Sequence, residues 1–354
     1  MHSLKKVAAA LLILAISLAL GEIGLRIVHR ISPSYVFHDD SYNRFRVRPG
    51  SSYYGFPINS LGFHDTEFSK ADGSSFRIVA LGDSFAFGVV PYRDNYLTLL
   101  EADLGQAGLR AEVFNMGIPR TAPADYLNLL VNEGLALEPD LVLVSFYIGN
   151  DLIETHRSLH RNRPLHQRSY VVSLLRFALR LRNRAEGGVF HDRQVYSDDA
   201  PTFSRPSYIE IIGDRAKVYL VGWDGMAASV DAVMDAIERM SVICRRRGIP
   251  VAVVLIPEET QLDPNLQAAL SLTYRLYREG EMDYLQPNRI LGDRLGAAAI
   301  PFLDLYPAFA AAAPSQRLYK PFDTHWNIAG NRLAADQIAA YLVAEKLIPE
   351  VDRR

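Results

Sequence analysis

Residues 76–88 read FRIVALGDSFAFG, and they predict a buried strand followed by a turn, around which the rest of the chain is organised. Residues 76–81 read as a buried strand, because five of them form a short apolar run with β-branched members: Phe76, Ile78, Val79, Ala80 and Leu81. The run breaks at Gly82, and Asp83 and Ser84 follow before the pattern becomes helical. Open α/β sheets bind ligands at the carboxyl ends of their parallel strands. Ser84 is therefore a candidate functional residue, although Gly-Asp-Ser alone also fits a tight turn with a helix cap.

Strand and helix patterns alternate along the rest of the chain. The predicted strands are residues 76–81, 111–115, 141–147, 251–256 and 302–305. Helical patterns lie around residues 96–104, 124–133, 227–247, 265–294 and 328–342. Strands that alternate with helices and read as continuous apolar runs indicate a parallel sheet that is covered on both faces. The sequence therefore predicts an α/β protein, a three-layer α/β/α sandwich with a five-stranded parallel sheet.

Polar residues follow the predicted strands at points that a doubly wound sheet brings to one edge. They are Ser84 after the first strand, Asn115-Met116-Gly117 after the second, Gly149-Asn150-Asp151 after the third and Asp323-Thr324-His325-Trp326-Asn327 beyond the fifth. The edge thus gathers a hydroxyl nucleophile, an imidazole with a nearby carboxylate, a glycine N–H and an asparagine amide. These groups are the ones that acyl transfer requires.

At these residues the sequence resembles the SGNH, or GDSL-type, serine hydrolases, whose four landmarks occur here in the family's order. The resemblance implies the flavodoxin-like SGNH fold, with Ser84 as nucleophile, His325 as base and Asp323 as the acid that orients it. It also implies an oxyanion hole made by the Ser84 N–H, Gly117 and Asn150. No metal or organic cofactor is implied. The chain has no Gly-x-Ser-x-Gly elbow, which argues against an ordinary α/β-hydrolase.

The resemblance covers about residues 76–345 and departs from the family's pattern at two places. The family usually has Asp-x-x-His, whereas this chain has Asp323-x-His325; a Ser–His dyad, with a backbone carbonyl holding the imidazole, is therefore the alternative to a triad. The family usually has Gly-x-Asn-Asp, whereas Gly149 directly precedes Asn150 here. The Asp-Thr-His-Trp string is also similar to the triad segment of alginate-type O-acetyltransferases, in which it precedes the serine rather than following it.

Several of these residues also have a purely structural interpretation. Asn150 could cap a helix that begins at Leu152, because asparagine is a favoured cap residue. We interpret Asp83 and Asp151 as caps or turn formers. Trp326 is either a wall of the site or a packing residue.

The first thirty residues are predicted to be a targeting segment. Lys5 and Lys6 precede the apolar run Val7 to Leu20, whose only polar member is Ser17. Ala19 and Gly21 are small residues with the spacing of a signal-peptidase site, whereas the helical pattern continues to Val28, as it would in an uncleaved anchor. A buried helix of a cytosolic protein is the third alternative. An anchor or a signal would place the remaining chain outside the cytoplasm, with the lysines inside.

Composition excludes several other classes. The formal net charge of −2 offers no general electrostatic case for binding nucleic acid. Cys244 is the only cysteine, so neither an intramolecular disulfide nor a cysteine-built metal site is possible.

Residues 31–75 contain many turn-forming and aromatic residues and predict an irregular arm packed on the main domain. Within that arm we interpret His64 and Asp65 as structural.

An insertion of about 75 residues, approximately 152–226, separates the third strand from the next helix. Its first part is rich in arginine, with Arg157, Arg161, Arg163, Arg168, Arg176, Arg180, Arg182 and Arg184. From Tyr170 to Arg184 the spacing is helical, and Arg176, Arg180 and Arg184 lie on one line opposite valines and leucines. Such a helix either packs on the core with its arginines in solvent or lies on an anionic membrane surface.

The leading hypothesis is thus an exported serine esterase that cleaves an O-acyl ester, for which O-acetyl is one candidate, of a small molecule, lipid or glycan. The alternatives are an O-acetyltransferase acting on a cell-envelope or secreted polysaccharide and a binding module without turnover. The predicted organisation is a signal or anchor over residues 1–30, an arm over 31–75 and an SGNH domain over 76–347. We expect the protein in the cell envelope, held through its N-terminal helix, or secreted if that helix is cleaved.

Overall fold

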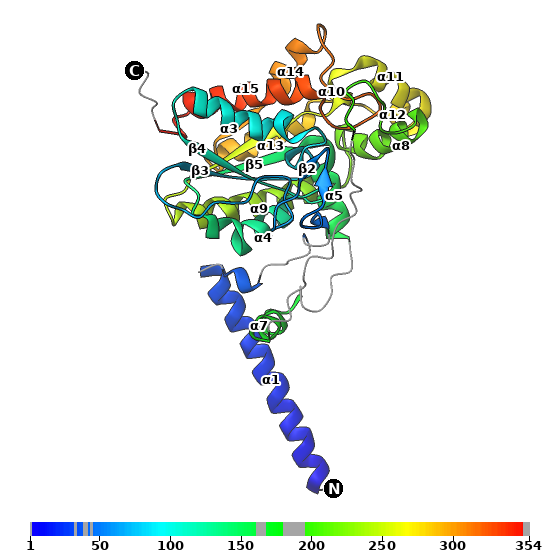
Figure 1. The fold of residues 1–354 in the computed structure, drawn as a ribbon. Helices are drawn as coiled ribbons and strands as arrows, with labels where there is room; N and C mark the ends of the chain where they lie inside the picture. Colours follow the sequence, from blue (N-terminus) through cyan, green and yellow to red (C-terminus); the bar gives the residue numbers. More distant parts are fainter. Residues whose placement is uncertain are drawn as a thin grey trace.

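Five parallel strands form the central sheet of the protein, in the order β4-β3-β5-β6-β7 (Figure 1). The computed structural model describes residues 2–31, 34–37, 42, 45–160, 168–179 and 195–349. The strands of the sheet are β3 (Phe76–Gly82), β4 (Ala111–Gly117), β5 (Leu141–Tyr147), β6 (Val251–Ile256) and β7 (Phe302–Asp304). The predicted five-stranded parallel sheet is therefore confirmed. β3 and β4 run slightly further than predicted, as far as Gly82 and Gly117, which pair with each other.

The strands are apolar on both faces because helices cover both sides of the sheet. Successive side chains of a strand point to opposite faces. In β3, Ile78 and Ala80 pack into one buried cluster, whereas Val79 and Leu81 pack into another on the opposite face. A continuous apolar run, rather than an alternating one, is therefore what this position in the sheet requires.

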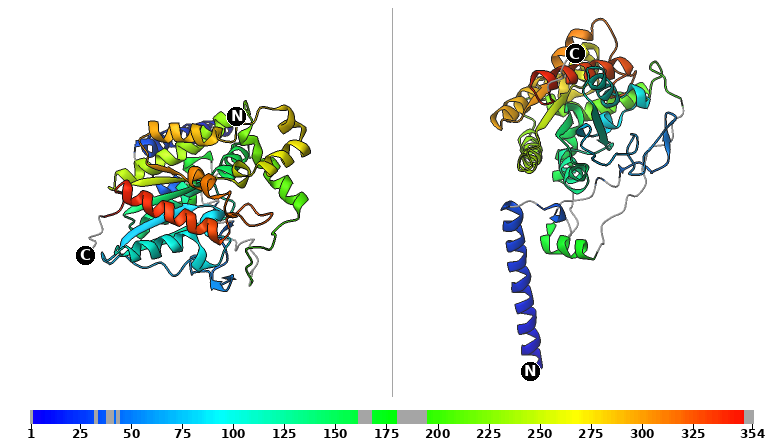
Figure 2. Two further views of the ribbon diagram at one scale, coloured as in Figure 1. Left: turned by 90° about the horizontal axis from the view of Figure 1, so that it is seen from above. Right: turned by 60° about the vertical axis from the view of Figure 1, so that its left-hand side comes forward.

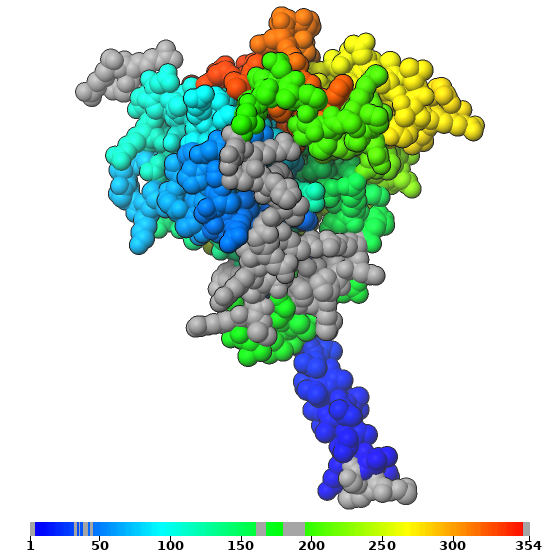
Figure 3. Space-filling view, turned by 45° about the vertical axis from the view of Figure 1, so that its right-hand side comes forward, coloured from blue at the N-terminus to red at the C-terminus, as the bar shows by residue number. Residues whose placement is uncertain are grey.

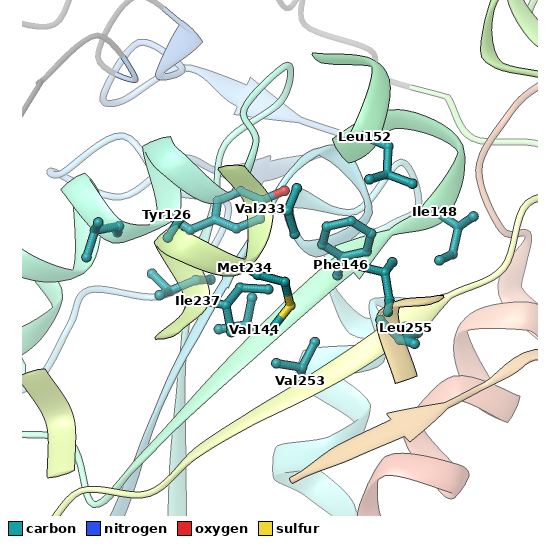
Figure 4. Packing of buried hydrophobic residues seen from close by; sticks show 14 of the residues in the cluster. Tyr126, Val144, Phe146, Ile148, Leu152, Val233, Met234, Ile237, Val253 and Leu255 are labelled. Carbon is teal, nitrogen blue, oxygen red and sulfur yellow. The ribbon is translucent and has the colours of Figure 1, made fainter. Parts of the chain in front are cut away.

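Helices cover both faces of the sheet and form two layers. One layer contains α3 (Tyr96–Gln106), α14 (Tyr306–Ala312) and α15 (Ile328–Ala344). The other layer contains α4 (Pro123–Asn132), α5 (Ile148–Leu159), α9 (Met226–Arg245) and α13 (Gln286–Ala297). The predicted three-layer architecture is thus confirmed. Figure 4 shows the second face from close by, where Tyr126 of α4 and Met234 of α9 pack with Phe146 of β5.

Shorter elements connect these layers. They are α2 (Ser84–Phe87), α8 (Arg205–Arg215), α10 (Glu259–Leu262), α11 (Pro264–Thr273) and α12 (Arg275–Glu279), with the 3₁₀ turns η1 (Tyr35–Phe37), η3 (Tyr92–Asp94), η4 (Gly134–Leu137) and η5 (Ala216–Tyr219). The predicted helical region 265–294 is divided among α11, α12 and α13. The division falls at Tyr274, whose backbone is extended, and at Gly280, which follows α12.

The N-terminal helix α1 (His2–Ile31) projects from the folded body as a narrow stalk (Figures 1 and 3). Its segment Leu4–Ile31 is long and apolar enough to cross a membrane, and its most apolar stretch is not buried by the protein. A signal sequence near the N-terminus has the same properties, so the helix is compatible with either function.

The arm and the insertion contribute fewer regular elements. The arm contains a short hairpin of β1 (Ser52–Tyr53) and β2 (Phe56–Pro57). The insertion contains α7 (Tyr170–Ala178), which lies beside α1, and α8. Arg180 and Arg184, two of the three arginines of the predicted line, lie outside the described residues.

Candidate active site

Ser84 begins helix α2 directly after the carboxyl end of β3. The side chain of Asp83 caps this helix and accepts a hydrogen bond from the Phe85 N–H at 2.9 Å, as expected for a cap. Gly82 precedes it where space is tight: a Cβ there would lie 2.7 Å from Ala86 Cβ and 3.0 Å from Ser145 Cβ. The backbone can therefore turn sharply after the strand and present Ser84 at the edge of the sheet.

His325 connects Ser84 with Asp323 through its two ring nitrogens. Nε2 of His325 lies 2.8 Å from Ser84 Oγ, and Nδ1 lies 2.6 Å from Asp323 Oδ1. The same carboxylate oxygen accepts the backbone N–H of His325 at 3.0 Å. Ser84, which is 241 positions away from His325 in the sequence, thus joins His325 and Asp323 in one continuous hydrogen-bonded chain.

The loop that carries Asp323 and His325 is a tight turn, and this turn explains the one-residue spacing. Lys320 N–H donates to the carbonyl oxygen of His325 at 3.1 Å, and Asp323 N–H donates to the carbonyl oxygen of Lys320 at 3.2 Å. Phe322 has a φ of 46°, which a bulky residue rarely adopts. The chain therefore doubles back, and the side chains of Asp323 and His325 come together on one side of it.

Asp323 is almost fully buried, with 1 % of its surface exposed. Burial by itself would raise the pKa of Asp323, but the electrostatic interaction with His325, the hydrogen bonds from its side chain and backbone, and a hydrogen bond from the Thr202 hydroxyl together lower it. The Thr202 hydroxyl donates to the second carboxylate oxygen, Oδ2. Both oxygens of Asp323 thus accept hydrogen bonds, which favours the ionised form.

Thr202 comes from the insertion, and nothing in its local sequence marks it as a site residue. Its segment is held against the loop of Asp323 by main-chain bonds: Thr202 N–H donates to Pro321 O at 3.3 Å, and Phe203 N–H donates to Phe322 O at 3.1 Å. The contact between Thr202 and Asp323 spans 121 positions in the sequence, so only the folded chain reveals it.

Asn150 lies in the first turn of α5, beside Asp83. Its Nδ2 donates to Asp83 Oδ2 at 3.2 Å, and an amide NH₂ has a second hydrogen to donate. The helix begins at Ile148 with Tyr147 as the cap residue, so the interpretation of Asn150 as a cap is wrong. Gly149 has no room for a side chain, because a Cβ there would lie 2.7 Å from the carboxyl group of Glu258.

Gly117 lies at the end of β4 with its backbone against α2. A Cβ on Gly117 would lie 2.1 Å from the Phe87 nitrogen, so only glycine fits there. The N–H of Gly117 donates to Asn115 Oδ1 at 2.9 Å. That N–H is thus already used in this structure, and its contribution to an oxyanion hole stays a prediction. The next loop passes close to the nucleophile turn, since Ile118 N–H donates to Gly82 O at 3.0 Å.

The remaining polar candidates have structural contacts. Asp151 accepts from Tyr147 N–H at 3.0 Å and from Tyr126 OH at 3.0 Å, in a fully buried position where desolvation raises its pKa. His64 is buried, with Nδ1 3.0 Å from the carbonyl oxygen of Phe87. These contacts agree with the structural interpretation of both residues.

Trp326 is a packing residue in this structure. It is 1 % exposed, and its ring contacts Phe85, Tyr96 and Phe309 at centroid distances of 4.8, 5.6 and 5.0 Å. Phe85 also lies 5.1 Å from the ring of His325. The tryptophan thus supports the apolar side of the site from beneath.

A buried charged cluster that the sequence analysis missed lies beside these residues. Arg215 Nη1 donates to Tyr147 OH at 3.2 Å, and Tyr147 OH donates to Glu258 Oε1 at 3.4 Å. Burial raises the pKa of Glu258, and the charge of Arg215 opposes that rise. Among the described residues, no group of three His, Cys, Asp or Glu side chains could hold a metal ion.

Part of the chain matches a family of SGNH hydrolase-like domains, the class that the resemblance implied. Residues 223–354 match the family model described as "SGNH hydrolase-like domain, acetyltransferase AlgX". The match covers less than half of the chain: it includes Asp323 and His325 but not Ser84. No curated protein matches the sequence.

Solved structures with a related arrangement include three esterases or acylhydrolases. The acetyl xylan esterase AlAXEase is 15% identical, with 75% of this chain and 98% of that chain covered and a TM-score of 0.44. The lipase/acylhydrolase from Enterococcus faecalis is 14% identical, with 78% and 99% covered and a TM-score of 0.39. A two-domain esterase active on acetylated mannans is 14% identical, with 78% and 52% covered and a TM-score of 0.39.

Proposed function

We propose that this protein is an exported serine esterase that cleaves an O-acyl ester, with acetyl as the favoured acyl group. The observation that carries the proposal is the hydrogen-bonded chain from Ser84 through His325 to Asp323, at 2.8 and 2.6 Å. A hydroxyl within reach of a base, with the base held by a third group, is the arrangement of an activated nucleophile.

In the first step, Ser84 Oγ attacks the ester carbonyl carbon while His325 Nε2 accepts the hydroxyl proton. The new C–O bond places a negative charge on the former carbonyl oxygen. When this tetrahedral intermediate collapses, the bond to the leaving alcohol breaks, and His325 returns the proton to that alcohol. An acyl-Ser84 ester remains, and the reverse sequence with an incoming hydroxyl removes the acyl group.

The oxyanion needs preorganised donors at the same edge of the sheet. Three donors come from the sequence prediction: the Ser84 N–H, the Asn150 amide and Gly117. Of these, Asn150 has the best support, because Asp83 holds one of its amide hydrogens and so orients the other. Asp83 thus serves as a positioning residue for Asn150 as well as the cap of α2.

The geometry favours a triad over a Ser–His dyad. The Asp323 carboxylate accepts a hydrogen bond from Nδ1 of His325, and the pKa of Asp323 is below its usual value. An ionised acid at this position holds the imidazole in the tautomer whose Nε2 can accept a proton, and it stabilises the imidazolium that forms.

An O-acetyltransferase that modifies a cell-envelope or secreted polysaccharide is the second candidate. The observation that favours it is the match of residues 223–354 to the family model described by the acetyltransferase AlgX. The two reactions share the acyl-enzyme, and they differ only in whether water or a sugar hydroxyl accepts the acyl group. For either reaction, helix α1 would anchor the protein in the membrane across which it is exported, or would be removed as a signal.

One assay separates the candidates. The purified full-length protein is incubated with a short-chain aryl acetate, with and without acetyl-free oligosaccharide acceptors, and both phenol release and acetylated sugar are measured. Release without sugar acetylation supports the esterase, and acetylated sugar supports the transferase. If neither product exceeds that of Ser84→Ala, the catalytic proposal fails and the binding module is left.

A further inference from the structure

Helix α7 crosses the stalk helix α1 close to the body of the protein. In Figure 1 it is seen nearly end-on beside α1, and in the right-hand view of Figure 2 it runs across the direction of α1. The contact lies near Gly21, where a Cβ would be 3.7 Å from Val171 Cγ2. If α1 crosses a membrane, a helix that runs across its direction lies roughly parallel to the membrane surface.

Glu22 of α1 holds the beginning of α7. Its carboxylate accepts the backbone N–H groups of Tyr170 and Val171, each at 3.0 Å, and the Ser169 hydroxyl at 2.9 Å. A carboxylate at a helix N-terminus satisfies donors that the helix leaves free and complements the helix dipole. Arg26 adds a bond to the carbonyl oxygen of Arg168 at 2.6 Å.

Aromatic contacts and one polar contact connect this junction to the part of the protein that is built around the central sheet, which we call the catalytic body. The ring of Tyr170 stacks on Phe37 at 4.6 Å and meets the edge of His29 at 5.3 Å. The distance between Nε2 of His29 and Nη2 of Arg239 on α9 is 3.0 Å. The end of α1, the start of α7 and the catalytic body therefore meet at one junction.

The other side of α7 presents leucines that the protein does not cover. Leu174, Leu175 and Leu179 are 40, 54 and 64 % exposed. Ile23 and Ile27 of α1, at the level of the junction, are 55 and 56 % exposed. Helix geometry places Leu175 and Leu179 on one face, with Arg176 at the edge of that face beside Leu179. Both helices thus expose apolar side chains, and the two helices are in contact.

The length of the apolar run in α1 shows what could cover this face. Val7 to Leu20 is fourteen residues, which rise about 21 Å in a helix, whereas a hydrocarbon core is about 30 Å thick. A core of this thickness needs about 20 residues of helix, so a span that starts at Val7 ends near Arg26. The outer boundary of the membrane would therefore fall about one turn beyond Glu22, the residue that holds α7. Arg26 and Arg168 lie at the same level, where cationic side chains meet lipid headgroups.

We propose that α7 is an interfacial helix: it lies on the outer surface of the bilayer that α1 crosses, with Leu174, Leu175 and Leu179 at the boundary between acyl chains and headgroups. The partner of this surface is the lipid bilayer. Glu22 would fix α7 to the anchor, and the contact of His29 with Arg239 would fix the catalytic body above it. The proposal does not depend on the chemistry at Ser84.

Quenching of tryptophan fluorescence by brominated lipids tests this placement. Full-length Leu175→Trp is reconstituted into phosphatidylethanolamine/phosphatidylglycerol vesicles whose acyl chains carry bromine either near the headgroup or near the chain end. Leu272→Trp on α11 is the matched control, because Leu272 is 80 % exposed and belongs to the catalytic body. Trp223 and Trp326 give a background that the unsubstituted protein measures.

We expect bromine near the headgroup to remove most of the added fluorescence of Leu175→Trp and bromine at the chain end to remove much less. Leu272→Trp should lose none. Equal behaviour of the two variants would overturn the proposal, and a protein partner or a second copy would then be the occupant of the face. Stronger quenching from the chain end would also overturn it, because α7 would then lie inside the bilayer. Leu179→Trp repeats the measurement at a second position if the first variant folds poorly.

Adding Glu22→Gln to Leu175→Trp tests the attachment. A neutral amide is a weaker acceptor for the N-terminus of α7, so α7 should separate from α1 more readily. We expect weaker headgroup-level quenching than in Leu175→Trp alone, while α1 keeps the protein in the vesicles. Unchanged quenching would show that Glu22 does not hold α7 at the surface.

Discussion

Asp323 and His325 are separated by one residue, and Oδ1 of Asp323 nevertheless accepts both the ring Nδ1 of His325, at 2.6 Å, and its backbone N–H, at 3.0 Å. This geometry depends on the turn that begins at Lys320. A longer spacing would let the carboxylate approach the ring alone. Here the backbone bond also fixes the distance between the two residues, so the short spacing is compatible with a carboxylate that orients the imidazole.

Replacing the members of this pair distinguishes a triad from a dyad. Asp323→Asn should keep the fold but favour the wrong imidazole tautomer, and by analogy with serine proteases kcat should fall by up to about 10⁴. His325→Ala is the control, since it should be severe under both mechanisms. A loss of about tenfold or less in Asp323→Asn, beside an inactive His325→Ala, would show that the triad assignment is wrong and that Ser84 and His325 act as a dyad.

Ser84→Ala should remove the nucleophile without disturbing the fold, because Asp83 rather than Ser84 caps α2. We expect kcat for aryl acetate hydrolysis to fall about a thousandfold or more, with an unchanged unfolding midpoint. Mass spectrometry of the unsubstituted enzyme quenched during turnover should show an acyl adduct on Ser84. Turnover retained by the alanine variant would contradict a serine mechanism.

Thr202→Val should change the pH dependence of activity. The Thr202 hydroxyl is one of the groups that lower the pKa of Asp323, and valine cannot donate a hydrogen bond, so that pKa should rise. An acid works here only when it is ionised, so activity should be lost at a higher pH as the solution is acidified. The kcat profile of the variant should therefore have its acid limb moved to higher pH, with a smaller deficit at neutral and alkaline pH.

A merely structural role for Thr202 predicts a different result. Activity would then fall by the same factor at every pH, or the unfolding midpoint would drop with an unchanged profile. Thr202→Ser keeps the hydroxyl and is the matched control. It should restore the acid limb of the unsubstituted enzyme.

Asn150→Ala should cost about 10²–10³ in kcat with little change in KM, which is the range for one oxyanion donor. Asp83→Asn tests how the amide is oriented. The new side chain has only one oxygen. If that oxygen still caps α2, the NH₂ of the new side chain faces the NH₂ of Asn150, and two donors then oppose each other. We therefore expect a smaller fall in kcat than in Asn150→Ala. An increase confined to KM in Asn150→Ala would make Asn150 a substrate-binding residue.

The N-terminal helix can be tested with the full-length protein. An uncleaved anchor should remain in the membrane fraction after alkaline carbonate extraction, and the purified protein should begin at or near Met1. A mature N-terminus at Glu22, together with release from the membrane, would show cleavage of a signal instead. Membrane retention with the intact N-terminus is the outcome that we expect, because Glu22 to His29 contact both α7 and α9.

Much of the sheet could be predicted because its signals are local. A strand covered on both faces is apolar at nearly every position: β6 is apolar throughout, and Ser145 is the one hydroxyl of β5 apart from Tyr147. Ser84, Asn150 and His325 could be found because each follows a strand or precedes a helix in an ordered series. The interpretation of Asn150 as a helix cap failed for a local reason as well, since α5 begins two residues before it.

Local sequence patterns are sufficient to predict the alternation of strands and helices, the apolar N-terminal helix and the residue types that acyl transfer needs. How these groups are used depends on the folded chain. Only the fold brings Thr202 to Asp323 across 121 positions, commits the Gly117 N–H to Asn115 and joins Glu22 to α7. Local patterns report whether a residue is buried and in which element, whereas a hydrogen bond between distant segments depends on how the chain closes between them, which no short pattern encodes.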